Sequence, residues 1–171
     1  MQNIILIGMP GVGKSTIGVI LAKTLGMGFV DTDLIIQGNE GKLLQEIIEK
    51  DGLDRFIGIE EKVMMSIRSF NIVIATGGSA IYSNRGMQYL KNNSITCYLM
   101  LPIEEIEQRI ANITTRGIVM KKNQSLYDIY LERVPLYERY ADIIIDCTNK
   151  NIECIVSEIK CKLSNNHTKY E

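Results

Sequence analysis

Short apolar runs recur along the chain, separated by longer segments with a different periodicity. The runs are apolar on both faces and end in turn-forming residues, which is typical of strands buried in a parallel sheet. They predict strands at residues 3–7, 71–75, 96–101 and 143–146, with a shorter candidate at 28–30.

The intervening segments place apolar residues at the i, i+3, i+4 spacing of one buried helix face. Three such faces are Ile17, Ile20, Leu21 and Leu25; Leu43, Leu44, Ile47 and Ile48; and Ile152, Ile155, Val156 and Ile159. A further amphipathic helix is predicted over about 126–140. Strands that alternate with helices predict an α/β fold in which helices flank a parallel sheet. We expect one domain over residues 1–163 and a polar tail at 164–171.

Composition narrows the function classes. The chain has 171 residues, 46% hydrophobic and 23% charged, which excludes a disordered chain. The net charge of −1 gives no basic field for nucleic acid or an anionic membrane, and no apolar run is long enough to span a bilayer. The cysteines form no CxxC pair, so neither a zinc site nor a redox motif is indicated. No export signal is recognised, so we expect reduced thiols in a cytoplasmic protein, and we also expect a monomer. Cys154 and Cys161 share one helix face and are predicted to be buried.

Charge is uneven along the chain although the total is near zero. Residues 31–61 carry nine acidic and three basic side chains, whereas residues 108–127 carry four basic side chains and no acidic one. The basic block is what a mobile anion-binding lid requires, and we place this lid at about 109–124. The single histidine, His167, lies in the polar tail, which excludes histidine catalysis.

The segment GMPGVGKST at residues 8–16 matches the phosphate-binding pattern G-x-x-x-x-G-K-[ST]. It follows a predicted strand and opens a predicted helix, the context that this motif requires. Backbone N–H groups of the loop and the helix N-terminus would cradle phosphates of ATP. Lys14 would reach the β- and γ-phosphates, and the Ser15 hydroxyl would bind Mg²⁺. The nucleotide-binding candidates in this loop are Gly11, Val12, Gly13, Lys14, Ser15 and Thr16.

Nucleotide binding leaves the reaction open. A switch GTPase would carry an N-K-x-D motif, which the chain lacks, and a motor ATPase would need a longer domain. Small-molecule kinases have this minimal length and place a substrate acid just after the second strand. The length of the chain and the acidic segment at residues 29–33 favour a kinase.

Two carboxylates, Asp31 and Asp33, stand where the second strand should end, in the segment FVDTD. In an extended segment, residues i and i+2 face the same side, here toward the phosphates. Asp31 would then hold Mg²⁺, and Asp33 would accept the proton of an attacking hydroxyl. The alternative is that the pair forms a turn or caps the following helix.

These motifs resemble the shikimate kinase family. The shared elements are the phosphate loop, FVDTD, ATGGS at residues 75–79, RVPLY at 133–137, and AD at 141–142 followed by ID at 145–146. The resemblance runs from about residue 1 to 160. It implies a five-stranded parallel sheet, ATP with Mg²⁺, and transfer of the γ-phosphoryl group to a hydroxyl of a small carboxylated ring such as shikimate.

On the acceptor side, the resemblance implies that Asp33 binds the substrate hydroxyls and assists their deprotonation. Gly77 and Gly78 match a glycine-rich turn whose backbone approaches the substrate, and Ser79 stands at the third glycine of that turn. Arg133 matches an arginine that binds the substrate carboxylate.

On the nucleotide side, the resemblance implies that Asp31 lies near Mg²⁺ and that Arg109 packs on the adenine. Arg116 stands at the lid arginine that contacts the phosphates and would act in catalysis with Lys14. Gly117 stands where a proline usually follows that arginine.

One substrate-binding position departs from the family's G-E-x-x-F-R-x-x-E pattern. Ile57 stands at the arginine, so the chain lacks one of two carboxylate-binding arginines. A charge-assisted contact of this kind contributes about 1.5–3 kcal/mol. Besides a shikimate kinase, the sequence therefore leaves open a kinase for another small acid, a polyol such as gluconate, or a nucleoside monophosphate. A non-catalytic nucleotide-binding regulatory module is the remaining alternative.

Overall fold

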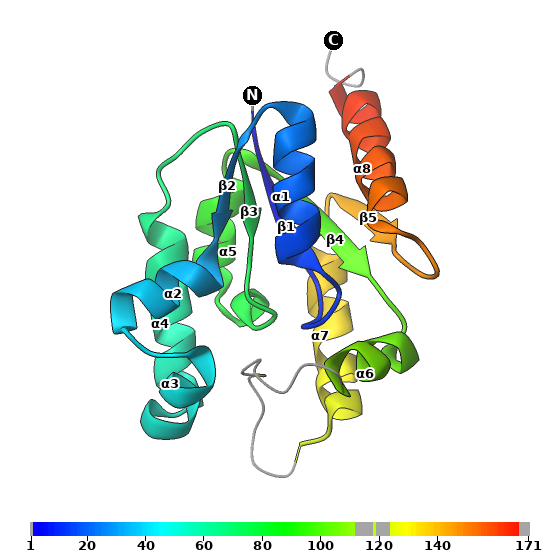
Figure 1. Ribbon diagram of the computed structural model, residues 1–171. Coiled ribbons are helices and arrows are strands. Elements are labelled where there is room, and N and C mark those ends of the chain that lie inside the picture. Colours follow the sequence, from blue (N-terminus) through cyan, green and yellow to red (C-terminus); the bar gives the residue numbers. More distant parts are fainter. Residues whose placement is uncertain (1, 112–117, 119–123, 168–171) are drawn as a thin grey trace.

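The computed structural model describes residues 2–111, 118 and 124–167, and within them five parallel strands form one sheet (Figure 1). The strands are β1 (Asn3–Ile7), β2 (Gly28–Asp31), β3 (Ile72–Ala75), β4 (Ser94–Met100) and β5 (Ile143–Asp146). Their spatial order is β2-β3-β1-β4-β5. The predicted α/β fold, a parallel sheet flanked by helices, is confirmed.

β1 lies at the centre of the sheet between β3 and β4, and all of its residues are buried. Burial on both faces explains why this strand is an uninterrupted apolar run in the sequence. Two strands extend past their predicted ends. β2 continues to Asp31, which pairs with Ala75, and β4 begins at Ser94, which pairs with Asn3. Backbone pairing thus runs beyond the apolar runs on which the predictions depended.

Helices cover both faces of the sheet (Figure 1). α1 (Lys14–Leu25) and α8 (Ile152–His167) pack against each other on one face, while α5 (Asn84–Lys91) and α7 (Leu126–Tyr140) contact β4 on the other. α6 (Ile103–Ala111) follows β4 and packs on α7. α8 continues to His167, so the segment predicted as a polar tail begins as helix.

Three helices between β2 and β3 form a lobe beside the carboxyl ends of the strands (Figure 1). They are α2 (Thr32–Glu40), α3 (Leu44–Asp51) and α4 (Leu53–Ser66), and a single turn of 3₁₀-helix, η1 (Ala80–Tyr82), follows β3. The lobe has its own small core of Ile36, Ile47, Phe56 and Val63. Leu43, predicted to share the buried face with Ile47, is instead exposed at the start of α3.

The four cysteines are free thiols, of which Cys97 and Cys147 are buried. The prediction that Cys154 and Cys161 are buried is wrong, because α8 turns Ile155 and Ile159 toward the core and leaves both thiols exposed. Within the part of the chain that the structure describes, no helix combines the length and the apolarity needed to cross a membrane.

Candidate active site

The phosphate loop follows the carboxyl end of β1, the central strand, which lies between β3 and β4. Its glycines adopt backbone conformations that other residues rarely take, with φ of +146° at Gly8, +86° at Gly11 and +101° at Gly13. A Cβ on Gly8 would also lie 2.6 Å from the carbonyl oxygen of Leu99. These constraints fix the backbone conformation of the loop, which leads into α1 at Lys14.

Lys14 is buried and holds the loop together. Its Nζ donates hydrogen bonds to the carbonyl oxygens of Gly8 and Met9 at 2.7 and 3.0 Å. The side chain also borders a cavity of about 200 Å³, together with Ser15, Asp31 and other residues. The predicted lysine, hydroxyl and carboxylate thus meet in one cavity.

Asp31 and Asp33 reach this cavity in a different way from that predicted. The extended arrangement is wrong: Asp31 ends β2 and is the N-cap of α2, where its Oδ1 accepts a hydrogen bond from the Asp33 backbone N–H at 3.0 Å. Asp33 therefore lies in the first turn of a helix. Both residues still border the same cavity as Lys14. The alternative that Asp31 caps the helix is therefore correct, and so is the expected location of both carboxylates near the phosphate loop.

A smaller cavity adjoins the first and shares four of its wall residues with it. It is bordered by Pro10, Asp33, Leu44, Phe56, Glu60, Gly77, Gly78, Ser79 and Arg133. The two glycines are required here because a Cβ on Gly78 would lie 2.8 Å from Pro10 Cδ, and one on Gly77 would overlap Glu60. The glycine turn, Asp33 and Arg133 were all predicted, and the structure brings them together.

Arg133 is 1% exposed, which excludes a surface salt bridge as its role. Its Nε donates a hydrogen bond to the hydroxyl of Tyr82 at 3.1 Å, and its guanidinium carbon lies 5.2 Å from the centre of that ring. Tyr137, one turn further along α7, donates a hydrogen bond to the Gly78 carbonyl at 2.6 Å. Two tyrosines thus fix the arginine and the glycine turn relative to each other.

Glu60 is the functional candidate that sequence reasoning missed. It lies on α4, is 2% exposed, and its Oε2 accepts a hydrogen bond of 2.5 Å from Ser79 Oγ. Burial raises the pKa of its carboxyl to about 8, against the opposing effect of the Ser79 hydrogen bond. Ile57 is half-buried on the same helix, whereas the cavity wall is formed by Phe56 and Glu60. The sequence did contain a signal for this residue, because Glu60 is the last acid of the G-E-x-x-F-R-x-x-E pattern.

A third cavity, of about 700 Å³, lies on the other side of the phosphate loop. Its wall consists of Val12, Gly13, Thr16, Ile17, Ile20, Arg109, Lys150, Asn151, Ile152, Glu153 and Ile155. Arg109 reaches it from α6, with its Nη1 3.4 Å from the Val12 carbonyl oxygen and its Nη2 3.4 Å from Glu105. The contact of Arg109 with adenine stays a prediction, and this cavity is where it would occur.

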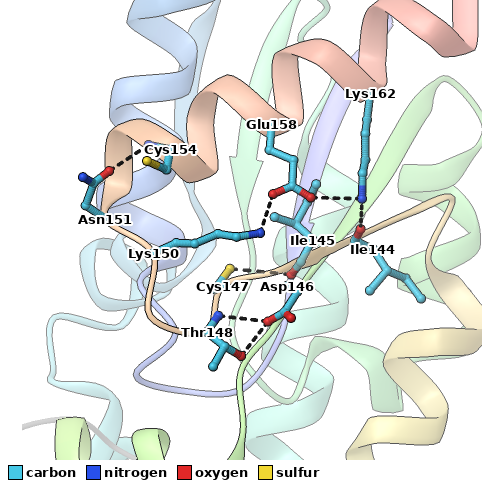
Figure 2. A network of polar contacts seen from close by, with 10 residues as sticks. All are labelled: Ile144, Ile145, Asp146, Cys147, Thr148, Lys150, Asn151, Cys154, Glu158 and Lys162. Atoms are coloured by element: carbon cyan, nitrogen blue, oxygen red, sulfur yellow. Dashed lines mark hydrogen bonds and ion pairs between the residues drawn. The ribbon is translucent and has the colours of Figure 1, made fainter.

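The loop between β5 and α8 completes this cavity and was not predicted as part of the site. Figure 2 shows how it is held: Asp146 accepts hydrogen bonds from the backbone and side chain of Thr148, at 2.9 and 2.5 Å. Lys150 pairs with Glu158 of α8 at 2.6 Å (Figure 2). The loop residues are polar and carry no motif, so only their position next to the phosphate loop reveals them.

The lid is only partly described. Arg109 lies on α6, whereas Arg116 and Gly117 lie outside the described residues, as do the other basic side chains of the predicted lid.

The chain is similar to known proteins in both sequence and fold. The family model described as Shikimate kinase matches residues 10–164. A shikimate kinase of Clostridium botulinum (strain Eklund 17B / Type B) is 36% identical over 97% of this chain and 100% of its own length. One of Bacillus mycoides (strain KBAB4) is 34% identical over 96% of this chain and 99% of its own.

Among solved structures, the shikimate kinase from Acinetobacter baumannii in complex with shikimate superposes with a TM-score of 0.88. It is 32% identical to this chain, and the match covers 97% of this chain and 94% of that one. The chain therefore belongs to the shikimate kinase family.

Proposed function

We propose that this protein transfers the γ-phosphoryl group of ATP to a hydroxyl group of shikimate. The observation that carries the proposal is the arrangement of three cavities around one phosphate loop, two on the acceptor side and one on the donor side. The two acceptor-side cavities are bordered by Lys14, by Asp33, which would act as the base, and by Arg133, which would bind a carboxylate. A relative of the same fold carries shikimate in its solved structure.

On the donor side, the adenine would lie in the cavity bordered by Arg109 and the β5–α8 loop. The amides of Gly11, Val12 and Gly13 would bind the phosphates. Lys14 Nζ would exchange its two loop carbonyls for phosphate oxygens, and Arg116 would approach the phosphates from the lid.

Mg²⁺ fits the donor set at the boundary between the two sides. Ser15 and Asp31 border one cavity, and both offer oxygen ligands. Mg²⁺ prefers oxygen and usually combines one or two protein ligands with water and phosphate oxygens. When bound there, it would neutralise charge on the phosphates.

In the transfer step, an acceptor hydroxyl oxygen attacks the γ-phosphorus and the bond from phosphorus to the bridging oxygen of ADP breaks. The hydroxyl proton passes to the Asp33 carboxylate. Lys14 and the loop amides stabilise charge on the transferred group, because they are fixed donors in a buried site. The products are a phosphate ester and ADP.

Arg133 would bind the acceptor carboxylate. Its guanidinium is already buried and oriented by Tyr82, so little side-chain entropy is lost when a carboxylate pairs with it. Gly77 and Gly78 let the side chains of Asp33, Glu60 and Pro10 approach the backbone of the turn closely. Ile57 stands where a second arginine would contribute.

The chain would act as one kinase domain over residues 1–163 with a lid at about 109–124. It would work as a cytoplasmic monomer on a small-molecule acceptor, without nucleic acid or membrane as a partner.

Coupled ADP release with different acceptors tests the function. We expect ATP turnover that depends on shikimate. Turnover with gluconate or a nucleoside monophosphate alone would assign a different acceptor, and slow ATP hydrolysis independent of any acceptor would indicate a regulatory nucleotide-binding module.

A further inference from the structure

Glu60 and Ser79 form a buried pair that the reaction described above does not use. Glu60 comes from α4 and Ser79 from the turn between β3 and η1, and each is 2% exposed. Ser79 Oγ donates a hydrogen bond to Glu60 Oε2 at 2.5 Å. The pair forms part of the wall of the small acceptor-side cavity.

The second carboxyl oxygen of Glu60 lies against the glycine turn that borders the small cavity. Oε1 is buried and has no hydrogen-bond partner among the residues that the structure describes. It lies in contact with the position that a Cβ on Gly77 would take, and Asp33 Oδ1 lies 2.9 Å from the same position. Two acids from different helices therefore converge on the bare face of the glycine turn.

A buried carboxyl oxygen without a hydrogen-bond partner is unfavourable, because it has lost its contacts with water and gained none in return. Native structures satisfy nearly all such groups, so one that borders a ligand cavity calls for a partner from the ligand. A purely structural role, tying α4 to the glycine turn, needs only Oε2. It leaves Oε1 unexplained.

Two departures from the family pattern affect this same carboxyl group. In F-R-x-x-E the arginine precedes the acid by three residues, a spacing at which side chains meet on a helix. Ile57 stands at that arginine and cannot pair with Glu60, while Ser79 replaces a glycine and supplies a hydroxyl donor. Glu60 thus has a neutral hydroxyl donor beside it and lacks the arginine that the family pattern places one turn away.

We propose that Glu60 is a further acceptor-binding residue, which donates a hydrogen bond from Oε1 to an oxygen atom of the bound acceptor, and that Ser79 positions it. This inference rests on the proposed function of the same cavity. It assigns Ser79 a positioning role and Glu60 a contact with substrate.

A donor at Oε1 requires the protonated carboxyl. The charged groups that face it are Asp33 from α2, Arg133 from α7 and Lys14 from α1. Burial dominates over all three and raises the pKa of Glu60 to about 8, so the carboxyl is neutral at pH 7. Above pH 8 it becomes an anion that only accepts hydrogen bonds and repels the carboxylate of the acceptor. Acceptor binding should therefore weaken as pH rises.

The test is the KM for shikimate between pH 6.5 and 9.5. For the wild type we expect a rise of about tenfold from pH 7 to pH 9, since only the protonated fraction binds. Glu60→Gln keeps a neutral donor of the same shape, so its KM should stay near the wild-type value at pH 7 and remain flat with pH. Glu60→Ala should raise KM at pH 7 roughly tenfold, with less effect on kcat.

Ser79→Ala tests the positioning role. It should raise KM less than Glu60→Ala does. It should also move the midpoint of the pH profile upward, because the Ser79 hydrogen bond lowers the pKa of Glu60 in the wild type and its removal raises that pKa. Glu61→Gln is the matched control. Glu61 accepts a similar hydrogen bond, from Ser83 at 2.5 Å, and pairs with Arg85. This variant should follow the wild type at every pH.

Two results would overturn the inference while leaving the function intact. They are a wild-type KM for shikimate that stays constant to pH 9.5, and a pH profile of Glu60→Gln that parallels the wild type. Failure of the proposed function looks different, since no protein in the series, the wild type included, would then turn over shikimate. In that case the same profiles are measured on the acceptor that ADP release identifies, with the same two overturning results.

Discussion

Glu60→Gln also tests the energetics of the acceptor cavity without any substrate. A glutamate carboxyl has an ordinary pKa of 4.5, whereas burial raises the pKa of Glu60 to about 8 in the folded protein. The folded state therefore holds this proton more tightly than the unfolded chain does. The stability that results is fully present below about pH 4.5 and is lost as the pH rises to 8, because over this range only the unfolded chain has released the proton.

The magnitude follows from the size of the shift. One pKa unit corresponds to about 1.4 kcal/mol, so this carboxyl should lower the free energy of unfolding by about 3 kcal/mol between pH 5 and pH 8. The side chain is 2% exposed, and solvent screening reduces this value little. Domains are stable by about 5–15 kcal/mol, so the loss is a substantial fraction.

Urea unfolding of the wild type and Glu60→Gln, followed by far-UV circular dichroism at pH 5, 6, 7 and 8, measures the effect. We expect the variant's advantage in unfolding free energy to grow by about 3 kcal/mol over this range. Glu61→Gln removes the neighbouring acid and keeps Glu60, so it should retain the wild-type dependence. Parallel pH curves for wild type and Glu60→Gln would refute the reasoning.

Three further predictions concern catalysis. Lys14→Ala should lower kcat at least about 100-fold in a folded protein, measured by coupled ADP release, and near-wild-type turnover would contradict the phosphate-loop mechanism. Asp33→Asn should lose about 10²–10⁴-fold in kcat, far more than Asp31→Asn, and equal mild losses would remove Asp33 from its role. Ile57→Arg should lower the KM for shikimate roughly 10- to 150-fold with less effect on kcat, because it adds a second partner for the carboxylate bound by Arg133. An unchanged or higher KM would show that Ile57 faces no carboxylate.

Local features of the sequence determined the sheet and the phosphate loop. A strand such as β1, buried on both faces, must be apolar throughout, and a loop that turns its amides inward needs glycine where φ is positive. These requirements act on neighbouring residues, so they are visible in the chain itself. The family motifs likewise identified Asp33 and Arg133 as parts of one site.

Tertiary structure decided the features that depend on contacts between distant residues. Asp31 both ends β2 and caps α2, and only the start of α2 immediately after it places Asp33 in a helix instead of an extended segment. Cys154 and Cys161 are exposed because the sheet meets a different side of α8.

Glu60 shows this dependence most clearly. It belongs to an acidic block that, in the sequence, resembles solvated surface. Its burial follows from the packing of α4 against α2 and the glycine turn, and its hydrogen-bond partner Ser79 lies 19 residues further along the chain. Because the pKa of a carboxyl depends on how much water surrounds it, sequence pattern alone could not predict the protonation of this site, which only the fold decided.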